Sequence, residues 1–192
     1  MQERCLTPIV HTGRVPAIEP PILRDGDLTL RPPRPEDADA VTAACQDAAI
    51  QRWVGVPSPY RREHAESWLA RCEAQAGAGE VVTLLAEGGD GRLAGSFSLM
   101  EMARRAGYGE IGYWVAAGAR GRGVASRSVA LMRDWACEAL RLRTIEILVH
   151  RDNAPSRAVA LRAGFADTGE LRLRPREPDA GPPSLIVYLW EA

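Results

Sequence analysis

The stretch from Ile111 to Ser126 constrains the fold of this chain more than any other. Residues 111–116 are mostly apolar or aromatic and predict a strand, and the glycine-rich residues that follow predict a short turn. From about Gly123 to Leu140 apolar residues recur at helical spacing, which predicts a long helix. Such a turn exposes consecutive backbone N–H groups at a helix N-terminus, a geometry that binds phosphate. The stretch therefore predicts a seat for a pyrophosphate group.

Composition excludes several classes of protein. The chain has 192 residues, of which 46% are hydrophobic and 26% charged, as expected of one globular domain. No apolar run approaches the roughly 18 residues that a membrane span needs. The first ten residues lack the apolar core of a signal peptide, so we expect a cytoplasmic protein with no membrane partner. The net charge of −1 gives no general attraction to nucleic acid, and we expect no nucleic-acid partner.

Cysteine and lysine usage narrows the chemistry further. The four cysteines and three histidines are scattered without the spacing of a zinc site, so we expect reduced thiols and no metal. All 24 basic residues are arginine. Schiff-base chemistry and a phosphate-binding lysine of the Walker type are therefore excluded. The abundance of Ala, Arg, Gly and Pro is typical of a GC-rich bacterial genome.

The remaining sequence predicts an α/β fold with a mixed, mostly antiparallel sheet of about seven strands and helices on both faces. Residues 1–26 hold four prolines and are predicted to form an extended arm, and residues 27–192 a single domain. A proline-rich loop is predicted over 174–183. Strands are predicted at 28–31, 81–86, 93–99, 108–116, 144–150, 165–173 and 184–190, and helices from 35 through Ala48 and Ala49, at 61–76, from 123 to 140 and at 154–163.

The glycine-rich turn by itself leaves alternatives open. Gly121-x-Gly123-x-x-Ser126 nearly matches a dinucleotide-binding fingerprint. Its third glycine is missing, however, and the preceding strands are predicted to form hairpins instead of βαβ units. The other alternative is a strand–helix turn that binds no ligand. A second element, about thirty residues further on, decides between them.

That second element runs from Arg151 to Phe165. Together with the blocks Ile-Gly-Tyr-Trp-Val at 111–115 and Arg-x-x-Gly-x-Ala at 120–125, its Asn-x-x-Ser…Gly-Phe pattern at 153–165 resembles the GNAT superfamily of N-acetyltransferases. Within that superfamily the chain looks like the ribosomal-protein N-terminal acetyltransferase branch (the RimJ/RimL type). The resemblance covers most of the chain from residue 27 onward and implies the GNAT fold. It also implies acetyl-CoA as the co-substrate, with no metal.

The resemblance places coenzyme A on particular residues. The strand 111–116 would splay from the strand 144–150, with the pantetheine arm in the gap and backbone N–H groups near Val115 pairing with it. Trp114 either packs under the cofactor or fills the core. Asn153 either caps a helix or binds the cofactor, or does both. The residues expected to bind the cofactor are Trp114, Val115, Arg120, Gly121, Arg122, Gly123, Val124, Ala125, Ser126, Asn153 and Ser156.

The catalytic groups are assigned less completely. The serine that matches Ser156 is proposed in RimJ/RimL-type relatives to protonate the departing thiolate, although a serine can also merely hydrogen-bond the sulfur. Some of these relatives carry a glutamate just after the Gly-Tyr-Trp strand, where this chain has Ala116-Ala117-Gly118. Glu110, at the start of the strand, is the nearest carboxylate and is either the general base or a solvated charge at the strand end, with Glu101 and Glu146 as weaker candidates for the base.

We therefore expect an N-acetyltransferase that moves an acetyl group from acetyl-CoA directly to a primary amine. The acceptor would be a protein N-terminus, a small metabolite or an aminoglycoside-like amine, and the enzyme a monomer or a homodimer. The alternative is a GNAT module that binds acyl-CoA as a sensor or scaffold without turnover. The missing carboxylate at residues 116–118 keeps that alternative open.

Overall fold

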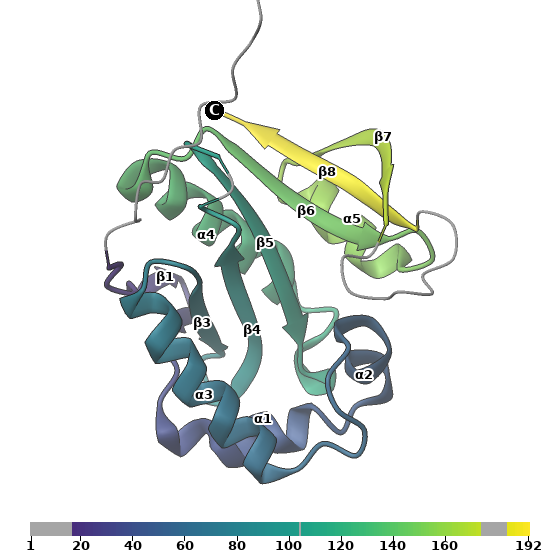
Figure 1. Ribbon diagram of the computed structural model, residues 1–192. Coiled ribbons are helices and arrows are strands. Elements are labelled where there is room, and N and C mark those ends of the chain that lie inside the picture. The colour runs from purple at the N-terminus through teal and green to yellow at the C-terminus, as the bar shows by residue number, and fades with distance from the viewer. Residues whose placement is uncertain (1–16, 104, 174–183) are drawn as a thin grey trace, which may run out of the picture.

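The computed structural model describes residues 17–103, 105–173 and 184–192, which form one eight-stranded sheet with helices on both faces (Figure 1). The strand order is β1-β2-β3-β4-β5-β6-β8-β7, and only β5 and β6 pair in parallel. The strands are β1 (Leu23–Asp25), β2 (Leu28–Arg31), β3 (Val82–Glu87), β4 (Leu93–Met100), β5 (Tyr108–Val115), β6 (Thr144–His150), β7 (Ala166–Arg172) and β8 (Leu185–Glu191). The α-helices are α1 (Ala38–Ala44), α2 (Ala48–Val54), α3 (Arg62–Gly77), α4 (Val124–Leu140) and α5 (Ala154–Arg162), with short 3-10 helices η1 (Pro35–Asp37) and η2 (Ala117–Ala119).

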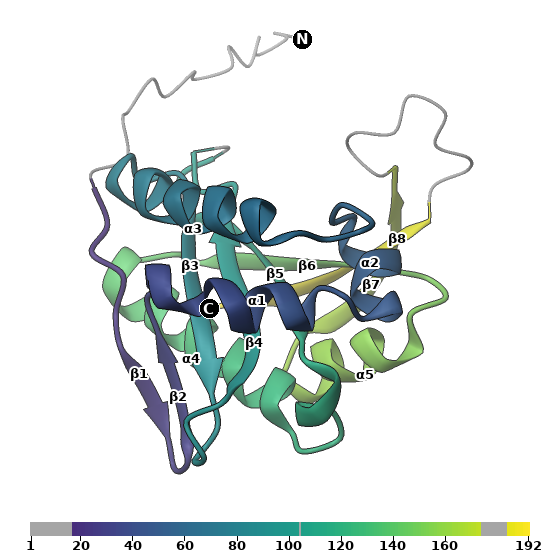
Figure 2. The ribbon, with the colours of Figure 1, turned by 90° about the horizontal axis from the view of Figure 1, so that it is seen from below.

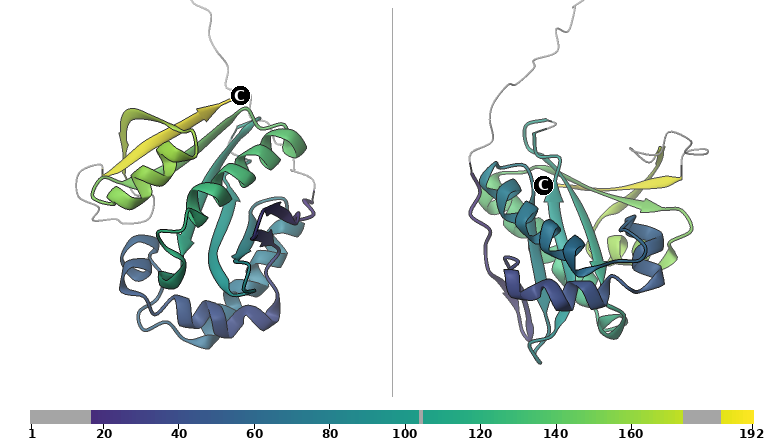
Figure 3. Two further views of the ribbon diagram at one scale, coloured as in Figure 1. Left: turned by 180° about the vertical axis from the view of Figure 1, so that it is seen from behind. Right: turned by 60° about the horizontal axis from the view of Figure 1, so that its bottom comes forward.

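The helices divide between the two faces of the sheet. Figure 3 shows α4 and α5 on one face, and Figure 2 shows α3 on the opposite side of the sheet from α4. Alternation along the strands explains the division, because successive side chains point to opposite faces. On β5, Ile111 packs in the core under α4, whereas Trp114 packs in a second core with α1, α2 and α3. The predicted two-sided α/β sheet is thus confirmed.

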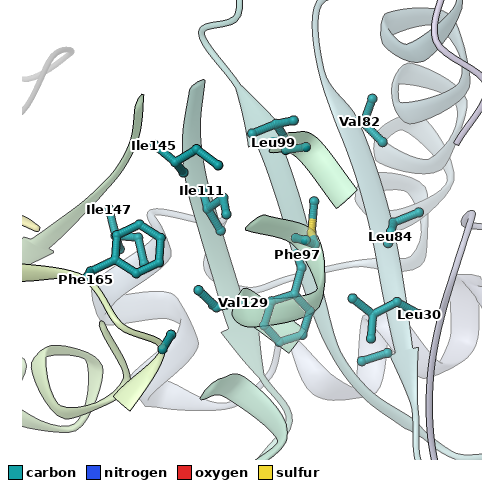
Figure 4. Packing of buried hydrophobic residues seen from close by; sticks show 14 of the residues in the cluster. Leu30, Val82, Leu84, Phe97, Leu99, Ile111, Val129, Ile145, Ile147 and Phe165 are labelled. Atoms are coloured by element: carbon teal, nitrogen blue, oxygen red, sulfur yellow. The ribbon is translucent and has the colours of Figure 1, made fainter. Parts of the chain in front are cut away.

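The main core lies between the sheet and α4 (Figure 4). Its central side chains come from β3, β4, β5 and β6 and meet Val129 and Met132 of α4, both with 0% exposure. Each large side chain buried in this way stabilises the fold by about 1.5–3 kcal/mol relative to exposure. This core fixes α4, and with it the glycine-rich turn, against β5. Ten of its residues are labelled in the figure: Leu30, Val82, Leu84, Phe97, Leu99, Ile111, Val129, Ile145, Ile147 and Phe165.

Two sequence predictions need correction. The single helix predicted from residue 35 through Ala49 is broken after Ala44, and α2 begins separately at Ala48. Asp47 interrupts it, because its Oδ1 accepts hydrogen bonds from the amides of Ala49 and Ile50 at 3.1 and 3.0 Å and so caps α2. The sheet also has an eighth strand, β1, which the sequence did not predict. Its three residues owe their extended form to pairing with β2.

The predicted arm is described only in part, and the predicted loop is not described at all. Residues 1–16 of the arm and the predicted loop at 174–183 lie outside the described residues. Residues 17–26, at the end of the arm, are described. There Ile18 packs in the main core and Leu23–Asp25 forms β1. The domain boundary after residue 26 stays a prediction. Of the helices in the described ranges, none is long and apolar enough to cross a membrane.

Candidate active site

Strands β5 and β6 diverge in the middle of the sheet. They pair only at Tyr108–Thr144, Gly109–Ile145 and Glu110–Glu146, although β5 continues to Val115 and β6 to His150. Beyond Glu110, in the described chain, one edge of β5 carries no pairing with a neighbouring strand, and Figure 1 shows the two ribbons separating there. Backbone groups at that edge are available to a ligand. The predicted splay is confirmed.

The strand pairing is fixed at the point of divergence by a buried carboxylate. Glu146 accepts a hydrogen bond of 2.7 Å from the Tyr108 hydroxyl and forms an ion pair with Arg172 of β7. Burial alone would raise the pKa of Glu146, but these hydrogen bonds outweigh it and hold the pKa below its ordinary value. Glu146 is therefore committed to holding β5, β6 and β7 together.

The glycine-rich turn leads from β5 into α4 as predicted. Gly121 and Gly123 have φ angles of +76° and +75°, a backbone conformation that favours glycine. Arg127 is the first residue of α4 whose amide donates a helical hydrogen bond, and its acceptor is the Gly123 carbonyl at 3.1 Å. The amides of Val124, Ala125 and Ser126 thus lie in the open first turn, where the helix dipole favours an anion. A Cβ added at Gly121 would have no atom of the described chain beyond its immediate neighbours within 4 Å, so the turn is sterically open.

Arginine side chains around the turn have partners that the sequence did not reveal. The Arg120 guanidinium donates from Nε to the Val115 carbonyl at 3.1 Å and from Nη2 to Asp47 at 2.6 Å. It thereby ties the turn to the N-cap of α2. Arg122 is exposed, and Arg127 forms ion pairs with Asp25 and Asp27 of the β1–β2 hairpin. Asp47 could not be found from sequence, because it lies 73 residues from Arg120.

Helix α5 brings Asn153 and Ser156 to the same gap. The Asn153 Oδ1 accepts a hydrogen bond from the Ser156 amide at 3.2 Å, which is the capping role. The Ser156 Oγ lies 2.7 Å from the hydroxyl of Tyr113 on β5. Tyr113 stacks on Phe97 with ring centroids 5.6 Å apart, and burial raises its pKa to about 12, so it stays protonated at neutral pH. Sequence reasoning missed Tyr113, although it stands in the Gly-Tyr-Trp block.

Glu110 and Trp114 lie on the opposite face of β5 from Tyr113. Glu110 is half-buried, pairs across the sheet with Met100 of β4 and lies beside Glu146. Trp114 is 8% exposed and packs in the core with α1, α2 and α3. The Trp114 side chain is therefore part of this core, while its backbone belongs to the diverging part of β5. Glu101, the other weaker candidate, follows β4 in a turn with a φ of +59°.

A cavity of about 180 Å³ lies between the helices α1–α3 and the strands β4 and β5. We call it the β4–β5 cavity. It is lined by Val41, Cys45, Val54, Val56, Tyr60, Trp68, Ser96, Ser98, Met100, Gly112, Tyr113 and Trp114. A second, more open hollow of about 480 Å³ lies between α1, the β3–β4 hairpin and Ala116–Gly118. The β4–β5 cavity borders the diverging part of β5, so it is the better candidate for an acceptor site.

Potential metal ligands are dispersed over the described ranges. Within them, no group of three or more His, Cys, Asp or Glu side chains is arranged to hold a metal ion. Burial raises the pKa of Cys45 and of Cys72 to about 11 each, and burial also raises the pKa of Cys137, so these thiols stay protonated at neutral pH.

Comparison with known proteins identifies a family and a relative. Residues 27–166 match the family described as "Acetyltransferase (GNAT) domain". The chain is 35% identical over 83 residues to the Bacillus subtilis (strain 168) protein named "Putative ribosomal N-acetyltransferase YdaF", and this match spans 43% of the chain and 45% of that relative.

Solved structures show the same fold. The Mycobacterium smegmatis RimJ in complex with CoA-disulfide superposes with a TM-score of 0.77 at 27% identity, covering 90% of this chain and 86% of that one. A RimL ribosomal L7/L12 acetyltransferase in complex with coenzyme A gives 0.78 at 19% identity, covering 89% and 98%. The family match extends over most of the present chain. This protein therefore belongs to the GNAT acetyltransferase family and within it resembles the RimJ/RimL branch.

Proposed function

We propose that this chain is an N-acetyltransferase that moves an acetyl group from acetyl-CoA directly to a primary amine. One observation carries the proposal: the part of β5 that has diverged from β6 leads into the open first turn of α4, and its Tyr113 hydroxyl lies 2.7 Å from the Ser156 hydroxyl of α5. Bound coenzyme A in the RimJ and RimL structures supports the choice of cofactor. The acceptor we favour is a protein N-terminus in the cytoplasm, because the relatives' names refer to ribosomal proteins.

The residues present suit the two ends of coenzyme A. Amides from Arg120 to Ser126 would hold the pyrophosphate, because backbone donors and a helix N-terminus favour a doubly charged group. The edge of β5 near Val115 would hydrogen-bond the pantetheine arm and the thioester carbonyl. The Arg120 side chain contributes by fixing the turn to α2, since Asp47 already occupies its guanidinium. Asn153 would act through its cap on α5, where its Oδ1 accepts the hydrogen bond from the Ser156 amide.

The reaction requires two proton transfers. The acceptor nitrogen attacks the thioester carbon, so a C–N bond forms and the C–S bond breaks. Glu110 would take the proton from the amine, directly or through water. Ser156 would return a proton to the sulfur or stabilise the thiolate by a hydrogen bond. Tyr113 would act through Ser156 as a positioning residue, because the two hydroxyls are 2.7 Å apart.

A turnover assay tests this function. The full chain is incubated with acetyl-CoA and a panel of amines that includes N-terminal peptides, small amines and an aminoglycoside. We expect thiol release that depends on the amine, together with an acetylated product detected by mass spectrometry. Tight coenzyme A binding without release across the panel would instead favour the sensor or scaffold. That alternative rests on Ala116-Ala117-Gly118, which hold no carboxylate.

A further inference from the structure

The β4–β5 cavity has apolar walls. They are formed by Val41, Val54, Val56, Trp68, Met100 and Trp114. Its volume is about 180 Å³, and an apolar protein cavity of about 150 Å³ is large enough to bind benzene. The cavity therefore has room for a group the size of a leucyl or phenyl side chain.

The polar groups in the cavity are neutral. Burial raises the pKa of Cys45 to about 11 and that of Tyr60 to about 12, and the two side chains hydrogen-bond each other. The Ser98 hydroxyl lies 2.8 Å from the Thr83 hydroxyl. The lining residues, all of them described, include no Asp, Glu, His or Arg. A charged group in the cavity would lose its hydration without gaining a counter-charge, which is unfavourable.

The cavity borders the place where the thioester is proposed to lie. Gly112 and Trp114 line it and belong to the part of β5 that has diverged from β6. Val54 at the end of α2 also lines it, and the neighbouring Trp53 ring lies 5.2 Å from the His150 ring of β6. Helix α2 thus reaches from the cavity to β6 on the far side of the gap. A group in the cavity would hold an attached amine next to the edge of β5.

We propose that the β4–β5 cavity selects an acceptor whose amine-bearing carbon carries an uncharged, apolar group of leucyl or phenyl size. The inference rests on the proposed acetyl transfer and narrows its acceptor class. Amino-terminal Leu or Phe satisfies it, whereas aminoglycosides and polyamines do not. The small methyl group of an amino-terminal alanine would leave most of the cavity unfilled.

Five peptides that differ only at their first residue test the proposal. With Ala, Leu, Phe, Glu or Lys at that position, we expect kcat/KM for the Leu and Phe peptides to exceed that for the other three at least tenfold, since even one methylene in an apolar pocket is worth about 10–200-fold. Equal or better use of the Ala, Glu or Lys peptide would overturn the proposal.

Two substitutions at Val56 sharpen the test. Val56 is half-buried at the cavity in the loop between α2 and α3, so the fold should tolerate change there. Val56→Trp should fill the cavity and lower kcat/KM for the Phe peptide at least tenfold while sparing the Ala peptide. Val56→Asp should improve the Lys peptide relative to the Phe peptide. Ser67→Trp, on the exposed side of α3, adds the same indole outside the cavity and should leave the preference unchanged.

A binding measurement separates failure of this proposal from failure of the proposed function. If no amine is acetylated, the proposed function fails, and the cavity is then tested with phenylalaninamide and alaninamide in the presence of coenzyme A. Tighter binding of phenylalaninamide, weakened by Val56→Trp but not by Ser67→Trp, supports the cavity assignment. Equal affinity of the two amides overturns it.

Discussion

The hydroxyl of Tyr113 lies 2.7 Å from the hydroxyl of Ser156, which joins β5 to α5 across the gap where β5 and β6 diverge. The two residues are 43 positions apart in the chain. Tyr113 is held by its stacking on Phe97, and the Ser156 amide is held by Asn153. The pair therefore gives Ser156 a fixed orientation at the site proposed for the thioester sulfur.

The first prediction concerns this hydroxyl pair. Ser156→Ala should lower kcat by about 10²-fold, the lower end of the range for general acid catalysis, with a smaller change in coenzyme A affinity. Tyr113→Phe keeps the ring stacked on Phe97 and should lower kcat about tenfold, as expected for one lost hydrogen bond. Because Tyr113 acts through Ser156, the double variant should be no slower than Ser156→Ala alone. Additive losses, or wild-type kcat for Tyr113→Phe, would contradict the positioning role.

The second prediction concerns the pyrophosphate seat. Gly123→Trp should weaken coenzyme A binding at least tenfold, because the indole would cover the open amides of the α4 turn. Gly169→Trp is a matched control: Gly169 has a similar φ of +71°, and a Cβ added there would meet no described atom within 4 Å, but it lies on β7. Both variants should lose about 1–2 kcal/mol of stability from the left-handed backbone. If calorimetry finds unchanged coenzyme A affinity in a folded Gly123→Trp variant, the pyrophosphate does not bind at this turn.

The third prediction concerns the general base. Glu110→Gln should lower kcat by about 10²–10⁴-fold and change the pH dependence of kcat, since a glutamine cannot take the amine proton. The exposed Glu80, in the turn before β3, supplies a control, and Glu80→Gln should leave the pH–rate profile unaltered. A wild-type profile for Glu110→Gln would remove Glu110 as the base.

The fourth prediction concerns the point where β5 and β6 part. Hydrogen bonds from Arg172 and Tyr108 outweigh burial and lower the pKa of Glu146 from 4.5. Because the folded pKa is the lower one, the carboxylate should stabilise the fold fully above about pH 4.5, and this contribution should fade as the pH falls through the folded pKa. Glu146→Gln should cost about 1–3 kcal/mol at pH 7, measured by urea unfolding, and should flatten the acid dependence of stability.

Glu170 offers the control for that measurement. It pairs with the same Arg172, but its side chain is 53% exposed. Glu170→Gln should therefore change the free energy of unfolding by no more than about 1 kcal/mol, as is usual for exposed pairs. Equal losses from the two variants would show that Glu146 does not hold the strands together.

Much of the fold was predictable because it depends on local patterns. The strands predicted at 93–99 and 108–116 and the helix predicted from 123 to 140 match β4, β5 and α4 to within one or two residues. The glycines at 121 and 123 marked the turn, since positive φ angles favour that residue. The break between α1 and α2 was missed because the alanine-rich pattern runs on through Asp47 and outweighed the preference of aspartate for the N-cap of a helix.

What the sequence could not predict depends on contacts between distant residues. Asp47 meets Arg120, and Tyr113 meets Ser156, only because the sheet brings α2 and α5 to the same gap. The three residues of β1 have no pattern of their own and form a strand by pairing with β2. The β4–β5 cavity is likewise made by side chains from three helices and two strands, so it has no signature at any one stretch of sequence.

A crystal structure of the chain with coenzyme A would show whether the cofactor binds where we propose. We expect the pyrophosphate on the amides of residues 120–126, the pantetheine arm between β5 and β6, and the sulfur within hydrogen-bond reach of the Ser156 hydroxyl. Coenzyme A bound elsewhere, with the gap between β5 and β6 empty, would show that the proposed cofactor site is wrong.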